Sequence, residues 1–401
     1  MPEKRERAVF VFMIIVALSG LALGLSDSVF SNYFRDAYNV DALQRGFIEL
    51  PRESPGIVSM LIVSSLAFLG DRRLAIIAHF LKIIGIFVLA FFSPPFAMML
   101  VFLFINSLGM HMFIPLYDSM GMSLAKEGGF GTIMGRFNSI RTAFAMIAGI
   151  MIFFGFRFGL FSFTAPIIWN FVIAGVLFTV IFFLLMYIRR LMDDNRPEKS
   201  NFVFKKRYTK YYILATLFGA RKQIMYVYGP WVLIELLNFG ADYMALLIIA
   251  GSAIGIFFLP IVGRWIDRFG TSKVMMVEAA LFLAIYLGYG IISAGLHGGW
   301  LLGVPLIIGI AVAVNIADRM TIQFGMVRAI YMRSVAEKPE DVTPTLATGM
   351  ALDHVLSIVS AIFCGFLWFE LGPQYVFVFA GVLTAGNFIV ARSIKKEVST
   401  S

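Results

Sequence analysis

The stretch GRWIDRFGTSKVM, residues 263–275, separates two long apolar runs, and a shorter relative of it, GDRRLAII at residues 70–77, occurs in the first half of the chain. Both stretches place an Asp and an Arg side by side just after an apolar run. Further on, GTIMGRFNSIRTAFAMIAG (131–149) stands opposite PTLATGMALDHVLSIVSAI (344–362) at a similar distance along the chain. We interpret these pairs as the remains of a duplicated unit.

Composition restricts the chain to one broad class. Of its 401 residues, 60% are hydrophobic and only 14% are charged, and the mean hydropathy is +0.86. Soluble domains carry about 25% charged residues, so a chain of this composition cannot cover its apolar surface in water. The single cysteine, Cys364, excludes an intrachain disulfide. The composition therefore predicts an integral membrane protein.

The apolar residues are grouped into segments of membrane-spanning length. A helix that crosses the hydrocarbon core needs about 20 apolar residues, and the chain holds about twelve such segments, so we predict an all-α fold with about twelve transmembrane helices. We interpret the first segment as a retained span, because it is longer than the apolar region of a signal peptide. The predicted limits are 8–30, 46–69, 74–92, 96–123, 132–156, 164–188, 211–237, 243–263, 273–293, 300–325, 345–369 and 374–391.

The basic residues predict an orientation. With the N-terminus inside, most of the 33 Lys and Arg residues fall in cytoplasmic segments, and only Arg35, Arg45 and Arg157 lie outside. This asymmetry follows the positive-inside rule and predicts a plasma (inner) membrane protein with cytoplasmic N- and C-termini. It also accounts for the net charge of +9 without a nucleic acid partner.

A basic linker, RRLMDDNRPEKSNFVFKKRYTK at 189–210, divides the spans into two predicted helical bundles, residues 1–188 and 211–401. The duplicated plan, this linker and the GRWIDRFG loop together resemble the major facilitator superfamily. The residues that match the loop signature of that family are Gly263, Asp267, Arg268 and Gly270, together with Asp71 and Arg72 in the first-half loop, where the signature's glycines are replaced by Ala67 and Leu74.

The resemblance implies two pseudo-symmetric bundles of about six helices that work by alternating access. It also implies that the signature loop joins the cytoplasmic ends of the two halves in the outward-open state, with Asp267 and Arg268 against the fifth span and Asp71 against the eleventh. A solvated turn that only carries positive-inside charge is the alternative interpretation.

Ionisable residues inside the spans point to function. Each buried charge costs about 2.5–3.5 kcal/mol on insertion scales, so these residues must pair or face a water-filled cavity. We expect ion pairs between the two halves on the cytoplasmic side, including one made by Arg328. The predicted ion-pair network consists of Arg52, Asp118, Arg136, Asp318 and Arg319.

The stretch GFIELPRESPG, residues 46–56, puts charges and two prolines where a span begins. Glu49, Arg52 and Glu53 stand at i, i+3 and i+4, so a helix places all three on one face. Two interpretations remain open: a self-neutralised triad that fixes a kink, and a gate or coupling site in which one glutamate exchanges a proton. The predicted proton-coupling residues are Glu49, Glu53, Asp27, Asp353 and His354.

Polar residues near the middle of the spans predict a substrate cavity. Arg141 in the fifth span aligns with His354 in the eleventh when the repeats are superposed. Arg binds carboxylate or phosphate through two parallel hydrogen bonds, which favours an anionic or zwitterionic substrate. The predicted cavity residues are Arg141, Arg221, Gln223, Asn106, Asn315, His354 and Asp353.

These observations predict a monomeric secondary transporter for a small-molecule substrate, coupled to protons or another ion. KEGGFGTIMG (126–135) lacks the features of a phosphate-binding loop, and the four histidines lack metal-ligand spacing, so we expect no cofactor, no metal and no enzymatic activity. Two alternatives stay open. One is a proton-coupled efflux pump for amphipathic compounds, with a cavity acid such as Asp27, Glu235 or Asp353; the other is a membrane scaffold that does not transport.

Overall fold

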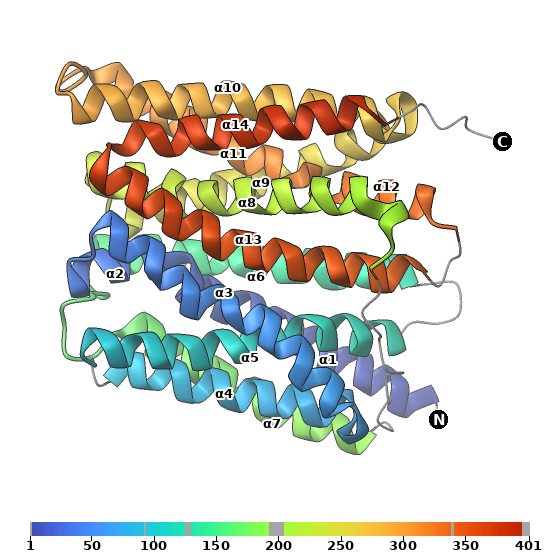
Figure 1. The fold of residues 1–401 in the computed structure, drawn as a ribbon. Coiled ribbons are helices and arrows are strands. Elements are labelled where there is room, and N and C mark those ends of the chain that lie inside the picture. The colour runs from blue at the N-terminus through green and yellow to red at the C-terminus, as the bar shows by residue number, and fades with distance from the viewer. Residues whose placement is uncertain (1, 92–93, 125–129, 192–203, 338–340, 395–401) are drawn as a thin grey trace. The chain divides into compact units, whose positions relative to one another are not determined.

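The computed structural model describes residues 2–91, 94–124, 130–191, 204–337 and 341–394. All regular elements in these ranges are helical (Figure 1). Lipid offers no hydrogen-bond partners, so a chain this apolar satisfies its backbone groups within helices. The α-helices are α1 Pro2–Ser26, α2 Phe30–Tyr38, α3 Ala42–Ser65, α4 Asp71–Phe91, α5 Phe96–Ser123, α6 Phe130–Arg157, α7 Trp169–Leu191, α8 Thr209–Trp231, α9 Ala241–Phe269, α10 Thr271–His297, α11 Pro305–Thr321, α12 Met326–Val335, α13 Val342–Glu370 and α14 Pro373–Arg392.

Every predicted span coincides with a helix, so the all-α membrane fold is confirmed. Within the described residues, eight helices are long and apolar enough to cross a membrane by length and composition. The tenth span, predicted at 300–325, is among the least accurate. Its helix α11 begins only at Pro305 and ends at Thr321, and a 3-10 turn at Ile322–Gly325 leads into α12.

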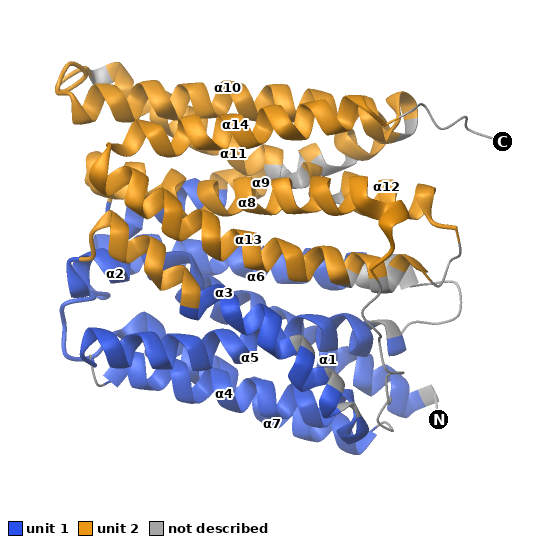
Figure 2. Ribbon diagram, in the orientation of Figure 1, with its two compact units in different colours: residues 1–39, 51–200, 240–249 blue, residues 40–50, 201–239, 250–401 orange. Residues whose placement is uncertain are grey.

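The chain divides into two compact units, which Figure 2 colours separately. Unit 1 comprises residues 1–39, 51–200 and 240–249, and unit 2 comprises residues 40–50, 201–239 and 250–401.

In unit 1, α4 packs against α5 and α7, and α1 packs against α6 and α7. Small residues allow the close approach of α4 and α5: a Cβ on Gly85 would lie 2.7 Å from the Asn106 backbone nitrogen. Likewise, a Cβ on Gly109 would collide with the Ala78 carbonyl. Tight backbone contacts of this kind drive helix association in lipid, where hydrophobic burial contributes little.

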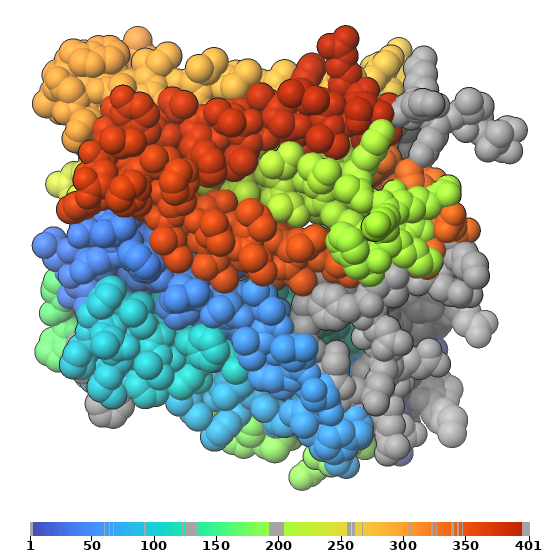
Figure 3. Space-filling view, viewed as in Figure 1, coloured from blue at the N-terminus to red at the C-terminus, as the bar shows by residue number. Residues whose placement is uncertain are grey.

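In unit 2, α8 packs against both α13 and α14, and its yellow-green surface is visible between them in Figure 3. Helix α10 packs against α14 and α11. The Tyr228 hydroxyl on α8 donates a hydrogen bond to the Ala361 carbonyl on α13 at 2.6 Å. One turn further along α13, Cys364 is fully buried in this interface region of unit 2.

Left-handed glycines precede α4 and α10. Gly70 has φ +84° directly before α4, and Gly270 has φ +81° directly before α10. In each turn the glycine carbonyl accepts a hydrogen bond from four residues further on, from Leu74 N at 3.2 Å and from Val274 N at 3.3 Å. The first-half turn is therefore as tight as the second although it lacks the other signature glycines. The signature residue Gly263 lies inside α9, before the turn at Gly270.

Candidate functional site

Helix α3 contributes charged residues to both units. In unit 2, Glu49 accepts a hydrogen bond on each carboxylate oxygen, from Arg45 Nη1 at 2.5 Å and from Gln223 Nε2 at 2.7 Å. The side chains of Arg45 and Glu49 have no exposed surface. Arg45, which we predicted to precede the span that begins at residue 46, is therefore a buried residue of α3 whose charge is balanced by Glu49. Its predicted location on the outer side of the membrane stays a prediction.

In unit 1, the next turn of α3 contacts α5 and the segment that follows α1. Arg52 Nη2 lies 3.3 Å from Asp27 Oδ1, and the Arg52 carbonyl accepts a hydrogen bond from Ser107 Oγ at 2.5 Å. Pro51 and Pro55 remove two backbone donors from this part of the helix. The prolines do not end α3, and Ser107 supplies a side-chain donor to the same turn.

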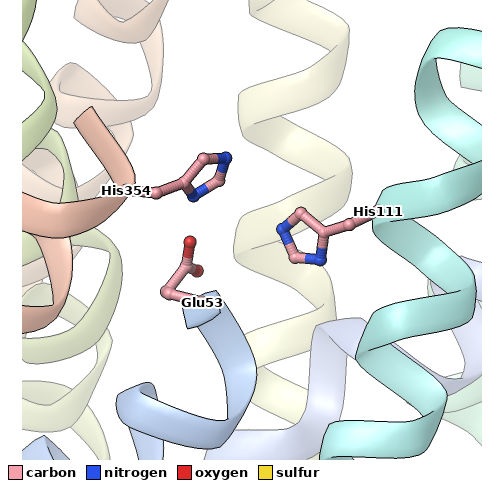
Figure 4. A group of neighbouring side chains, drawn as sticks. All are labelled: Glu53, His111 and His354. Carbon is pink, nitrogen blue, oxygen red and sulfur yellow. The ribbon is translucent and has the colours of Figure 1, made fainter. Parts of the chain in front are cut away.

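Glu53 and His111 approach each other within unit 1. Figure 4 shows the His111 ring directed from α5 toward Glu53 on α3, and a Glu53 carboxylate oxygen lies within 4.8 Å of a His111 ring nitrogen. His111 Nδ1 lies 3.0 Å from the Ser107 carbonyl oxygen. The Ser107 hydroxyl lies 3.1 Å from the same nitrogen, so Ser107 fixes the orientation of the imidazole ring.

His111 was absent from the predicted site. The available signal was its position four residues after Ser107, which places both side chains on one face of a helix. That spacing shows a shared helix face, but it does not reveal that Glu53 of α3 faces it.

Arg141 lies on α6 with its guanidinium carbon 5.3 Å from the centre of the Tyr117 ring on α5. Its side chain is exposed, as are those of Asp118 and Arg136. Asp118 interacts electrostatically with Arg141, yet among the described residues no carboxylate lies within 4.0 Å of the Arg141 guanidinium. Arg141 thus keeps hydrogen-bond donors for a further partner.

A buried charge cluster in unit 2 joins α8, α10 and α12. Glu278 accepts hydrogen bonds from Arg221 Nη2 at 2.8 Å and from Arg328 Nη2 at 2.7 Å. The side chains of Glu278 and Arg221 have no exposed surface, and the Phe218 ring lies against both guanidiniums. Arg221, which we predicted to line the cavity, is thus enclosed in unit 2, with buried Asp318 within electrostatic range. We had predicted an ion pair of Arg328 between the two halves. Arg328 instead pairs with Glu278 within unit 2.

Asp353 on α13 has two partners in unit 2. Lys222 Nζ lies 3.1 Å from Asp353 Oδ2, and Ser357 Oγ donates to Oδ1 at 3.2 Å. The adjacent His354 is half-buried (Figure 4). The efflux alternative needs an acid without a cationic partner, and Asp353 has one, as does Asp27.

Asn106 and Asn315 are buried and use their amides within their own units. In unit 1, Asn106 Nδ2 donates to the Lys82 carbonyl at 3.2 Å. In unit 2, Asn315 Nδ2 donates to the Tyr289 hydroxyl at 2.9 Å, and its Oδ1 accepts from Arg319 Nε at 3.1 Å. Both asparagines therefore join neighbouring elements of a bundle.

The loop-signature residues differ between the two loops. Asp71 and Arg72 are buried at the start of α4, and the Asp71 carboxylate accepts a hydrogen bond from the Ser119 hydroxyl. Arg268 is exposed at the end of α9, with its guanidinium 5.3 Å from the centre of the Phe269 ring. The side chain of Asp267 lies outside the described part of the chain. The predicted role of these residues in joining the two halves stays a prediction.

Comparison with known proteins gives a consistent family and fold. A model of the Major Facilitator Superfamily matches residues 12–337. No curated protein sequence matches the chain. Among solved structures, the nucleoside transporter NupG superposes with a TM-score of 0.71 at 13% identity, over 96% of this chain and 97% of that chain.

Two further solved structures are similar. A POT family transporter in complex with a thioalcohol-conjugated peptide gives a TM-score of 0.74 at 12% identity, over 96% of this chain and 95% of that chain. A D-xylose-proton symporter gives 0.64 at 13% identity, over 97% of this chain and 96% of that chain. At such identities the likeness concerns the fold alone.

Proposed function

Because the chain belongs to the Major Facilitator Superfamily, we propose that it is a proton-coupled transporter that moves a small anionic or zwitterionic organic solute by alternating access. Residues 1–188 and 211–401 are the two bundles that move, and residues 189–210 link them. The distribution of Lys and Arg supports an inner-membrane location with both termini in the cytoplasm.

The proximity of Glu53 and His111, with a carboxylate oxygen within 4.8 Å of a ring nitrogen, is the observation that carries this proposal. Both side chains exchange protons when their surroundings change, and Glu53 is only half-buried. A proton on Glu53 removes its attraction to a protonated His111, so proton binding alters the interaction between α3 and α5. One of the structural neighbours is a D-xylose-proton symporter, which supports a proton as the coupling ion.

The exposed guanidinium of Arg141 supports the proposal that the substrate carries a negative charge. It stands beside the Tyr117 ring with donors available, and a guanidinium offers two parallel N–H groups to a carboxylate or phosphate. Each charge-assisted hydrogen bond of this kind contributes about 1.5–3 kcal/mol, so one such contact accounts for at least about a tenfold preference for an anion.

The test is uptake by sealed proteoliposomes with an imposed pH gradient and a panel of organic acids, amino acids, nucleosides and short peptides. We expect Glu53→Gln to abolish gradient-driven accumulation while exchange of solute across the membrane persists. Glu370→Gln, at the exposed end of α13, is the matched control and should behave as the wild type. Gradient-driven accumulation by Glu53→Gln at the wild-type rate would refute the proton-coupling role.

Arg141→Gln tests the substrate class in the same vesicles. We expect its half-saturating concentration for the anion to rise about tenfold or more, from the loss of a charge-assisted hydrogen bond. Arg157→Gln removes the same charge from an exposed site at the end of the same helix and should leave uptake unchanged. Expulsion of a cationic dye that persists in Arg141→Gln would instead favour the efflux alternative.

A further inference from the structure

A polar cavity lies in unit 2 where the linker enters α8. Its volume is about 320 Å³, which falls within the range of about 300–1,000 Å³ that is usual for ligand sites. The cavity is lined by Arg207, Tyr208, Tyr211, Tyr331, Ser334, Val335 and Ala336. None of these residues belongs to the proposed transport site.

We infer that this cavity binds a phosphate group, and that the phosphate belongs to the headgroup of an anionic membrane lipid. The inference concerns a second ligand and does not depend on the transported solute. It rests on the charge around the cavity, on the helix end that borders it and on its position at the end of a membrane span.

The residues around the cavity carry an excess of positive charge. The cations that line it or flank its lining residues along the chain are Lys205, Lys206, Arg207, Lys210 and Arg333, and the described carboxylates near them are Glu337 and Asp341. Lys205 Nζ lies 2.6 Å from Asp341 Oδ1, and this hydrogen bond raises the pKa of Lys205. The ammonium therefore stays charged at neutral pH, and an anion is the complementary ligand.

The N-terminus of α8 borders the cavity through Tyr208 and Tyr211. The 3-10 turn Lys206–Tyr208 precedes this helix, and the N–H groups of Tyr208 and Thr209 donate to the Lys205 and Lys206 carbonyls. The helix therefore contributes through the positive end of its dipole, which favours phosphate. The C-terminus of α12 also borders the cavity, and Arg333 in its last turn offsets the partial negative charge of that helix end.

Glu337 forms an ion pair with Arg207, whose side chain lines the cavity. Arg207 Nη1 lies 2.6 Å from Glu337 Oε1, but the two side chains are 62% and 46% exposed. An ion pair so exposed contributes little stability. A phosphate offers two oxygens to the guanidinium and can displace Glu337, so Arg207 and Glu337 should affect phosphate binding in opposite directions.

The position of the cavity favours a lipid as the source of the phosphate. Helix α8 carries the span predicted at 211–237 and, with 23 residues, is about 34 Å long. A helix of this length that crosses the hydrocarbon core ends among the headgroups, and the proposal places the N-terminus of α8 there. Tyrosines are enriched at that level, and Tyr208, Tyr211 and Tyr331 line the cavity. Basic pockets between helices at this depth bind anionic headgroups.

The test is lipid binding to the purified full chain in a neutral detergent, counted by native mass spectrometry during titration with phosphatidylglycerol or phosphatidylcholine. We expect phosphatidylglycerol to bind more tightly. Arg207→Gln should weaken its binding about tenfold, and Glu337→Gln should strengthen it about threefold, from the loss and the release of a bidentate contact. Arg264→Gln makes the same change in net charge at an exposed position of α9, away from the cavity lining, and should shift binding at most about twofold.

Soluble arms of the experiment use glycerol 3-phosphate and inorganic phosphate, with thermal unfolding of the protein as the measurement. Stabilisation by these compounds that Arg207→Gln removes would assign the site to a soluble phosphate and overturn the lipid source. Equal effects of Arg207→Gln and Arg264→Gln, or weaker binding in Glu337→Gln, would overturn the phosphate site itself. Unchanged thermal unfolding of the unliganded variants ensures that lost binding does not reflect misfolding.

Discussion

Helices α4 and α10 begin alike and then bury opposite charges. Both follow a left-handed glycine, Gly70 or Gly270. Helix α4 buries Lys82, whose side chain is 1% exposed, among the helices of unit 1. Helix α10 buries Glu278, which has no exposed side-chain surface, among those of unit 2.

The two charges are stabilised by different means. The Lys82 ammonium lies 4.7 Å from the centre of the Phe113 ring and 5.2 Å from that of Phe178, and among the described residues no carboxylate lies within ion-pair distance of it. Glu278 instead has both oxygens bonded to guanidiniums. Aromatic faces stabilise a desolvated cation by about 2 kcal/mol, whereas a buried ion pair leaves an uncompensated charge when one partner is lost. The comparison therefore teaches that the protein tolerates the loss of the Glu278 charge far less well than the loss of the Lys82 charge.

The largest expected effect is that of Glu278→Gln. Removing the carboxylate leaves two buried guanidiniums uncompensated and should lower the free energy of unfolding by about 3–5 kcal/mol. Thermal unfolding of the purified protein in detergent measures this loss. Replacing Glu278, Arg221 and Arg328 together by apolar residues should restore most of the stability. A stable Glu278→Gln variant would break the comparison.

An intermediate effect tests the shared start of the two helices. Gly70→Ala and Gly270→Ala each force a Cβ onto a left-handed backbone, which costs about 1–2 kcal/mol. Gly263→Ala is the control, because Gly263 is helical and an added Cβ there meets no atom within 4 Å. The unfolding transitions of the first two variants should shift by similar amounts. A neutral Gly70→Ala would mean that the first-half turn does not depend on its glycine.

The smallest expected effect is a gain of stability in Lys82→Met. A charge inside the membrane costs about 2.5–3.5 kcal/mol, which exceeds the contribution of about 2 kcal/mol from the aromatic faces. The substitution should therefore raise the free energy of unfolding by about 1 kcal/mol. Lys222→Met removes the same charge but deprives Asp353 of its ammonium, and it should be less stable than the wild type. A Lys82→Met variant that is less stable than the wild type would show that Lys82 makes an interaction that stabilises the protein more than the two aromatic rings do.

Hydropathy located the helices because lipid enforces helical backbone wherever apolar segments are long. The span predicted at 96–123 has the limits of α5, Phe96–Ser123. The tenth span failed at its start because the prediction followed apolar composition, whereas Gly303 has φ +77° and the helix begins only at Pro305. The left-handed turn at Gly303, which hydropathy does not detect, therefore sets the start of α11 at Pro305.

The partners of the charged residues were not predictable from spacing. Glu49, Arg52 and Glu53 were correctly placed on one helix, but Arg45 was placed before the span because charge counting treats every flanking cation as exposed. Its partner Glu49 also accepts a hydrogen bond from Gln223, which lies far away along the chain. Such pairings depend on which helices become neighbours, and this information is absent from the periodicity of any single helix.

The burial of Cys364 has a practical consequence for measuring motion. It is the only cysteine in the chain and is enclosed within α13 of unit 2, and a thiol buried in apolar surroundings is inert toward labelling reagents. Cysteines introduced at exposed helix ends thus become the reactive positions of an otherwise natural sequence. Placed in pairs, they carry spin or fluorescent labels whose separation would test the proposed movement of the two bundles in a lipid membrane.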